Sequence, residues 1–259
     1  MRQHWVWVLV LLLAGVNPAG AAVRDHLLSL NEHLLLDGGG QLPFGGTVYQ
    51  PALVHGFYQT QDYRPAWNDS DQARRVVGLL AASEEDGLNP ADYHYDELLS
   101  LAERHRMAGQ GQEQLRARFD LLLTDGLLLY LRHLAEGKVD PRTLDPSFNY
   151  RRRNFQAETI HARLREAIGR GTLARVVERI RPDEPFYVLM RSELAKYRQL
   201  AATRAFRPVP DDAVLKPGQS HANIPLLRER LAEMGYLQPG APAGTRFDPA
   251  LEEAVRRFQ

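Results

Sequence analysis

Apolar side chains recur every three or four residues along much of this chain, and the clearest example covers residues 115–134. Because an α-helix turns once in about 3.6 residues, this spacing collects the apolar side chains on one broad stripe. The stripe consists of Leu115, Phe119, Leu122, Leu123, Leu127, Tyr130, Leu131 and Leu134. The pattern therefore predicts one long helix with a buried face.

Capping residues mark further helices. Asp69-Ser70-Asp71 precedes an apolar helical pattern, and Gly87 is placed to end that segment in the left-handed conformation that glycine tolerates. Asn89-Pro90 then offers a new cap and a first-turn proline. Apolar spacing predicts additional helices at residues 98–101, 160–168, 173–180 and 185–197.

The alternation typical of β-strands is rare in this chain. No convincing alternating run exceeds four residues outside the glycine-rich segments, so any sheet should be small. Residues 37–56, which contain Gly38-Gly39-Gly40 and Gly45-Gly46, have the composition of an irregular loop, and residues 205–220 have that of a proline-containing linker. We therefore predict a mainly α protein with a helical domain before the linker and a smaller module after it.

Two short amphipathic helices are predicted in this smaller module, at residues 224–237 and 247–259. The first contains Leu-Arg-Glu-Arg-Leu and ends in Gly-Tyr-Leu, and the second opens with Phe-Asp-Pro and ends in Ala-Val-Arg-Arg-Phe-Gln. The module, residues 221–259, resembles the three-helix peptidoglycan-binding family, which implies that peptidoglycan is a partner. Family members continue past Phe-Gln with a third helix. We therefore expect a truncated module with an uncovered apolar face and weak or absent wall binding on its own.

Polar residues of the module are its candidate contacts. Its apolar positions match those of the family and are expected to form its core. Arg228, Arg230, Arg246 and Asp248 are expected at the surface, where they can contact glycan or stem peptide. The alternative is that they have no partner, because polar residues at helix surfaces need none.

The first 21 residues have the pattern of a secretory signal peptide. Arg2 gives a positive start, residues 5–16 form an apolar run, and Ala19-Gly20-Ala21 offers a small-residue cleavage site. The run is shorter than the about 20 apolar residues that span a bilayer. We expect export to the periplasm, a mature chain that begins near Ala22 and a lead segment at residues 22–49. An uncleaved segment would instead anchor the protein to the membrane.

Composition excludes several kinds of chemistry. The chain has no cysteine, so it has no disulfide, no thiolate metal site and no cysteine nucleophile. Its 32 basic and 32 acidic residues balance, so no overall field favours nucleic acid, and we expect no nucleic-acid partner. The nine histidines lack a metal-ligand spacing such as HExxH. We therefore expect neither a metal site nor a cofactor.

Several short motifs in the larger domain point to a second family. Tyr63-Arg64-Pro65-Ala66-Trp67 is followed by Glu85-Asp86-Gly87-Leu88-Asn89-Pro90, then by Leu121-Leu122-Leu123-Thr124-Asp125 and by Gly137-Lys138-Val139-Asp140-Pro141. Their order and spacing resemble the helical scaffold domain of large periplasmic L,D-transpeptidases. The resemblance places this scaffold domain at residues 50–204 and continues into the module. It implies a role in peptidoglycan cross-linking and cell-wall organisation, with other cell-wall synthesis proteins as further partners.

The resemblance brings no catalytic residue to this chain. Family members form an acyl-enzyme on a cysteine in a Ser-His-Gly-Cys type motif of a C-terminal catalytic domain, and these 259 residues contain no such motif. Acyl transfer through a thioester requires a thiolate, a base and oxyanion donors. We therefore predict a non-catalytic scaffold and wall-targeting part of a protein whose full-length relatives are acyltransferases.

Two other functions stay open. Glu84-Glu85-Asp86 is an acidic cluster, and glycoside cleavage uses a carboxylic acid of raised pKa beside a second carboxylate, so a peptidoglycan hydrolase centred on Glu84 or Glu85 is one alternative. Three consecutive acids also suit a solvated helix end. The second alternative is a stand-alone interaction protein that docks partners of the wall-synthesis machinery.

Other candidate contacts have structural alternatives too. Tyr58, Tyr63 and Trp67 could stack on sugar rings or pack a loop onto the helical core. Asp120 and Thr124 are expected to give local order by hydrogen bonding on a helix face. Arg151-Arg152-Arg153 could meet stem-peptide carboxylates or form a solvated corner.

Overall fold

The computed structural model describes residues 18–43, 45–108, 112–145, 147, 155–203, 208–238 and 244–259. Over these ranges the protein is mainly helical, and extended pairing is limited to two isolated antiparallel bridges, Gln41 with Thr47 and Ser220 with Arg246. The mainly α prediction is therefore confirmed. No helix within these ranges is both long and apolar enough to cross a bilayer. The chain divides into two compact units between Lys196 and Tyr197.

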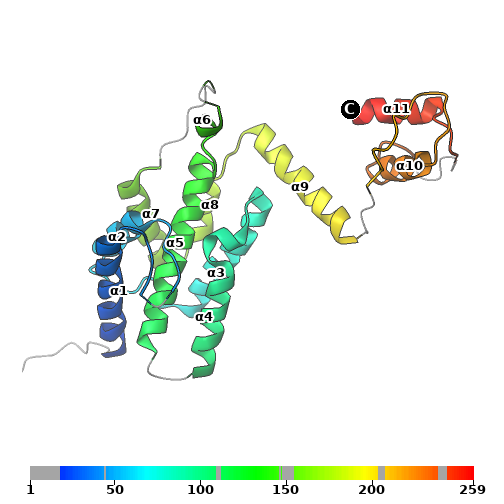
Figure 1. Ribbon diagram of the computed structural model, residues 1–259. Coiled ribbons are helices and arrows are strands. Elements are labelled where there is room, and N and C mark those ends of the chain that lie inside the picture. Colours follow the sequence, from blue (N-terminus) through cyan, green and yellow to red (C-terminus); the bar gives the residue numbers. More distant parts are fainter. Residues whose placement is uncertain are drawn as a thin grey trace, which may run out of the picture. The chain divides into compact units, whose positions relative to one another are not determined.

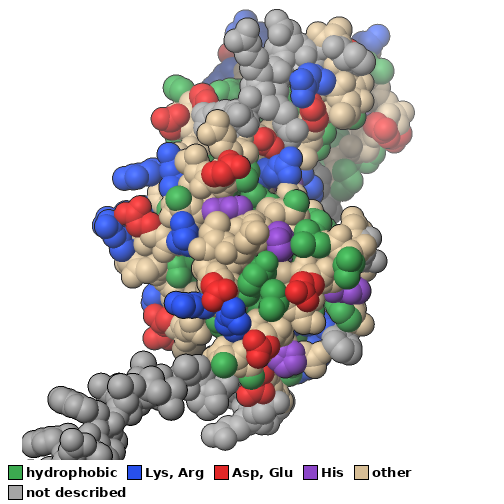
Figure 2. All heavy atoms as spheres, turned by 90° about the vertical axis from the view of Figure 1, so that its left-hand side faces the viewer, with side chains coloured by type: hydrophobic (Ala, Val, Ile, Leu, Met, Phe, Trp, Pro, Cys, Tyr) green, Lys and Arg blue, Asp and Glu red, His purple; other side chains and the backbone are tan. Residues whose placement is uncertain are grey.

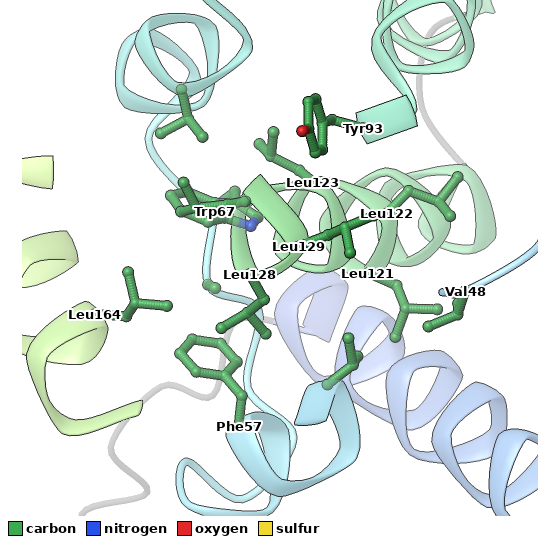
Figure 3. Close-up of a cluster of buried hydrophobic side chains, with 14 of the residues drawn as sticks. Val48, Phe57, Trp67, Tyr93, Leu121, Leu122, Leu123, Leu128, Leu129 and Leu164 are labelled. Carbon is green, nitrogen blue, oxygen red and sulfur yellow. The ribbon is translucent and has the colours of Figure 1, made fainter. Parts of the chain in front are cut away.

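The long helix predicted at residues 115–134 is α5, Glu113–Glu136, and it forms the centre of the larger unit (Figure 1). It contacts α1 (Pro18–Asp37), α2 (Pro51–Gln59), α3 (Ser70–Ala81), α4 (Tyr95–Ala108) and α8 (Leu173–Ile180). Five leucines of α5 are buried with Phe57, Trp67 and Leu164 around them (Figure 3), namely Leu121, Leu122, Leu123, Leu128 and Leu129. Burying each such side chain stabilises the fold by about 1.5–3 kcal/mol, so α5 organises this core.

The predicted caps are present. Asp69 precedes α3 and accepts hydrogen bonds from the backbone N–H groups of Asp71 and Gln72. Gly87 follows the 3₁₀ helix η1 and has the left-handed φ of 74° that glycine tolerates. Asn89 caps the next 3₁₀ helix, with Pro90 in its first turn. The remaining elements of the larger unit are η1 (Ala82–Asp86), η2 (Pro90–Tyr93), α6 (Pro141–Leu144), α7 (Ala157–Arg170) and α9 (Pro185–Thr203), which runs across the boundary between the units.

The N-terminal part of the larger unit contains a helix that the sequence analysis missed. Helix α1 begins at Pro18, within the predicted signal segment, and continues through most of the predicted lead segment. Its buried apolar side chains are Val23, Leu27, Leu30 and Leu34. They follow the three- and four-residue spacing of an amphipathic helix, so this helix has a local signal in the sequence. Residues 1–17 lie outside the described part, so export and cleavage stay predictions.

The predicted loop at residues 37–56 is shorter than expected because α2 begins at Pro51. The loop before it is closed by a hydrogen bond of 2.7 Å from the backbone N–H of Val48 to the carbonyl oxygen of Gly40. A Cβ atom at position 40 would lie 2.2 Å from the carbonyl oxygen of Val48, and Gly40 has a φ of 74°. Only glycine fits this close approach without displacing the backbone.

After the end of α9, the described residues of the smaller unit include the helices α10 (Ile224–Glu233) and α11 (Pro249–Phe258). Its buried core consists of Ile224, Leu231, Phe247, Leu251 and Ala254. Backbone hydrogen bonds from Phe247 to Gln219 and from His221 to Thr245 connect the segments that precede the two helices. The ring of Phe258 packs edge-on against Tyr236 but is still 48% exposed.

Candidate functional site

Arg228 of the smaller unit connects α10 to the start of α11. Its Nη2 donates a hydrogen bond of 2.9 Å to the carbonyl oxygen of Arg246 and a second one to Oδ2 of Asp248. Asp248 also caps α11, because its Oδ1 accepts from the backbone N–H of Leu251 at 2.9 Å. The Leu251 N–H and the Arg228 guanidinium hold the pKa of Asp248 below its usual value. Arg228 and Asp248 therefore fix the geometry of the smaller unit.

The expected surface positions of Arg228 and Arg230 are wrong. Arg228 is 5% exposed and Arg230 is 8% exposed. Each is buried beside an acid, Arg228 against Asp248 and Arg230 against Glu233, with an N–O distance of 2.5 Å in the second pair. Burying a cation is costly unless an anion accompanies it, and these two acids supply the compensation that makes inward-facing arginines possible.

The other two predicted contact residues lie nearer the surface. The side chain of Arg246 is exposed, and Asp248 is partly exposed although its carboxylate is already engaged. Two arginines that the sequence analysis did not single out, Arg256 and Arg257, are also exposed on α11. Arg246 is therefore the predicted contact residue whose side chain can most readily reach a wall polymer, and its binding role stays a prediction.

In the acidic cluster Glu84-Glu85-Asp86 of the larger unit, Glu84 and Glu85 are exposed, which fits a solvated helix end, whereas Asp86 has a structural role. Asp86 is fully buried and bonded to Arg181. Burial acts to raise its pKa, but hydrogen bonds, the strongest of them from Arg181, outweigh burial and lower it below the usual value. Glu85 is exposed and pairs with Arg191 at 3.0 Å. A glycosidase acid needs a raised pKa, whereas Asp86 is held ionised as a structural anchor.

Comparison with known protein families assigns both units. Residues 52–194, more than half of the 259 residues, match the family model described as a scaffold domain. The chain belongs to the scaffold-domain family. Residues 220–259 match the model of a putative peptidoglycan binding domain, so the protein carries a cell-wall-associated module after its scaffold domain. No match was found among curated proteins.

The scaffold domain contains a buried polar cluster around Asp120 and Thr124 of α5. The hydroxyl group of Tyr58 lies 2.7 Å from Oδ1 of Asp120 and 2.8 Å from Oγ1 of Thr124. The backbone N–H groups of Ala66 and Trp67 donate to the Asp120 carboxylate, both at 2.9 Å, and the Trp67 indole donates to Thr124. The expected local order is confirmed, although Thr124 bonds the carbonyl oxygen of Asp120 within the helix and not its carboxylate.

These contacts decide between the two interpretations of the aromatic residues. Tyr58 is fully buried and Trp67 is 7% exposed, so both pack the loop at residues 60–69 onto the helical core. The partly buried Tyr63 packs against the same core, with its ring centroid 6.0 Å from that of His55. The packing alternative is therefore confirmed for these three residues.

A cavity of about 660 Å³ lies beside the Asp120 cluster. Its lining is mostly apolar, with Trp67, Leu99 and Phe119 among the larger side chains and Arg74 among the charged ones. Burial raises the pKa of Asp120 to about 6, although its hydrogen-bond donors act in the opposite direction. Because Tyr58 and two backbone groups already occupy this carboxylate, it positions the loop and is not available to a ligand.

Arg151-Arg152-Arg153 lies outside the described residues. In the described part of the chain, no group of three or more histidine or acidic side chains is arranged to hold a metal ion.

Proposed function

We propose that this chain is the non-catalytic scaffold and wall-targeting part of an L,D-transpeptidase-like protein that acts in peptidoglycan cross-linking and cell-wall organisation. The observation that carries the proposal is the order of two domains in one chain. A scaffold domain at residues 52–194 precedes a peptidoglycan-binding domain at residues 220–259. In this arrangement the smaller unit attaches the protein to the wall, and the larger unit provides a rigid helical body.

The chemistry of cross-linking supports a non-catalytic role for these residues. Acyl transfer through a thioester needs a thiolate, and the chain has no cysteine. The buried acids Asp86, Asp120 and Asp125 all accept hydrogen bonds from groups that hold the fold together. In this proposal a cysteine-bearing domain provides the transferase activity, and the present residues position it.

The proposal includes a location and further partners. The apolar run at residues 5–16 and the small residues that follow it support export to the periplasm by a cleavable signal peptide. If the segment is retained, it anchors the protein to the membrane. Proteins of the wall-synthesis machinery are the further partners that a scaffold in this location would meet.

Co-sedimentation with purified peptidoglycan sacculi tests wall attachment. The chain without residues 1–21 is expected to co-sediment weakly. Leu251 is fully buried in the small core, so Leu251→Asp should disrupt the smaller unit and abolish co-sedimentation. Ala250→Asp places the same charge at the neighbouring exposed position of α11 and should retain it. Unchanged co-sedimentation of Leu251→Asp would show that the smaller unit does not attach the protein to the wall.

A further inference from the structure

A cleft lined by arginines lies between α7 and α8 of the scaffold domain. The two helices follow each other in the chain and pack together, with a tight connection at Gly171 and Thr172. The backbone N–H of Thr172 donates to the carbonyl oxygen of Ala167 at 2.9 Å, which fixes the start of α8 relative to the end of α7. The cavity between the helices has a volume of about 230 Å³.

The register of the two helices brings four arginines to this one cleft. Arg163 and Arg170 come from α7, where they are two turns apart, and Arg175 and Arg179 come from α8, where they are one turn apart. The cleft also contains one acid, Glu166. Four guanidinium groups against one carboxylate make this a strongly positive site on a chain whose total charge is zero.

Most of this positive charge has no acidic partner in the described part of the protein. Glu166 pairs with Arg170 at 3.0 Å, and both side chains are more than half exposed. Arg163, Arg175 and Arg179 form no ion pair with any residue that the structure describes. Figure 2 shows basic and acidic side chains interspersed over one face of the protein. Gathering like charges in one concave place costs energy in the free protein, and an anionic ligand would remove that cost.

The shape and the chemistry of the cleft indicate the kind of anion. Guanidinium groups bind carboxylates through two parallel hydrogen bonds, and several of them can share a ligand with more than one carboxylate. Val176 and Ile180 contribute apolar, partly buried surface, which suits the carbon chain that joins such carboxylates. A volume of about 230 Å³ accommodates a short acidic segment and not a folded partner.

We propose that the cleft between α7 and α8 binds the carboxylates of peptidoglycan stem peptides and gives the scaffold domain its own contact with the wall. The inference rests on the proposed function, because wall attachment by the smaller unit is what brings stem peptides close to the cleft. A second and weaker contact on the same polymer raises the overall affinity when both can be engaged at once. The scaffold domain then orients the bound strand in addition to being tethered to it.

Titration with a soluble peptidoglycan fragment tests the inference on the whole chain without residues 1–21. The probe is a disaccharide that carries a tetrapeptide with free carboxylates, measured by calorimetry at low salt. We expect Arg175→Gln combined with Arg179→Gln to weaken binding by about tenfold or more, because each guanidinium contributes charge-assisted hydrogen bonds. The control combines Arg74→Gln with Arg142→Gln, which removes the same charge from exposed positions outside the cleft and should change binding by less than about twofold.

Two ligand controls make the outcome decisive. The same fragment with its carboxylates amidated should bind at least about tenfold more weakly to the unmodified protein. Equal binding of the amidated fragment, equal effects of the two double variants, or tighter binding of inorganic phosphate at the cleft would each overturn the inference. If the fragment does not bind the cleft while sacculi still co-sediment through the smaller unit, the inference fails and the proposed function stands. If the fragment binds the cleft but sacculi do not co-sediment, the wall-targeting proposal fails and the cleft remains a carboxylate site.

Discussion

Arg181 and Asp86 form a two-point ion pair in which Nε lies 2.9 Å from Oδ1 and Nη2 lies 2.9 Å from Oδ2. The hydroxyl groups of Tyr130 and Tyr187 donate to the same carboxylate at 2.7 and 2.9 Å. The carboxylate is fully buried, and the Arg181 side chain is 10% exposed. One acid at the end of η1 thus joins α5, the end of α8 and the start of α9.

Asp86→Asn is expected to lower the free energy of unfolding of the scaffold domain by about 3–5 kcal/mol. The substitution removes the buried carboxylate that Arg181, Tyr130 and Tyr187 all contact, and it leaves the Arg181 guanidinium with only the exposed Glu178 as an acidic partner. Urea denaturation followed by circular dichroism measures the change. Glu85→Gln removes an exposed acid one position earlier and should cost less than about 1 kcal/mol. Similar losses for the two variants would contradict a structural role that is specific to Asp86.

The pH dependence of stability should carry a contribution from Asp120. Its pKa is raised to about 6 in the folded protein, while an aspartate in an unfolded chain titrates near about 4. Between these values the folded state holds a proton that the unfolded state has released. The contribution of Asp120 to the free energy of unfolding therefore falls as pH rises from about 4 to 6. We expect Asp120→Asn to be less stable than the parent protein, because its amide cannot accept from both backbone N–H groups.

The difference in unfolding free energy between Asp120→Asn and the parent protein should therefore shrink as pH rises from 4.5 to 7, since only the parent loses the proton, at a pKa of about 6. Denaturation midpoints at both pH values measure it. A constant difference for Asp120→Asn would show that this carboxyl does not titrate in that window.

Gly126 in the middle of α5 should not tolerate a side chain. A Cβ atom there would lie 2.5 Å from the carbonyl oxygen of Tyr93, which belongs to the backbone of η2 and cannot rotate away. We expect Gly126→Ala to destabilise the scaffold domain by about 1–3 kcal/mol, the usual cost of overpacking. Gly78→Ala on α3 meets no atom within 4 Å and should stabilise it by up to about 1 kcal/mol through helix propensity. Thermal unfolding of both variants should give opposite signs.

Arg228 and Arg246 should respond differently to substitution. Arg228→Gln leaves Asp248 without its buried partner and should destabilise the smaller unit by about 3 kcal/mol, so that co-sedimentation with sacculi is lost through unfolding. Arg246→Gln changes an exposed side chain and should leave stability within about 0.5 kcal/mol. If Arg246 contacts the wall, its variant remains folded and co-sediments less. Amide NMR spectra separate the two cases.

Local sequence patterns were sufficient to predict the helices that have their own capping residues or apolar stripes. The apolar spacing that predicted α5 depends only on residues within one helix, and the caps at Asp69 and Asn89 act over two or three residues. Such features are properties of neighbouring residues, so they can be read without knowledge of the fold. Helix α1 had an equally local stripe at residues 23–34, within the segment that the sequence analysis assigned only as a lead segment.

Polar anchors between distant segments could not be predicted in the same way. Asp125 of α5 accepts hydrogen bonds from the backbone N–H groups of Tyr49 and Gln50 and contacts Nε2 of His94 at 2.7 Å. The sequence separation from Tyr49 is 76 residues, and no periodicity connects the two. The inward orientation of Arg228 has the same origin, because its partner Asp248 lies 20 residues later. A charged residue on an amphipathic helix is assigned to the surface unless its partner is known.

The partners of Asp86 also set an order in which this domain can fold. Arg181 is 95 residues and Tyr187 is 101 residues further along the chain. Before Arg181 is available, the Asp86 carboxylate has no cation in this buried position, so its desolvation is unfavourable. Packing of the preceding helices around Asp86 is therefore unfavourable until the later residues are present. Contacts with such large sequence separation also slow folding. The chain would therefore bury Asp86 only after nearly the whole scaffold domain has been synthesised.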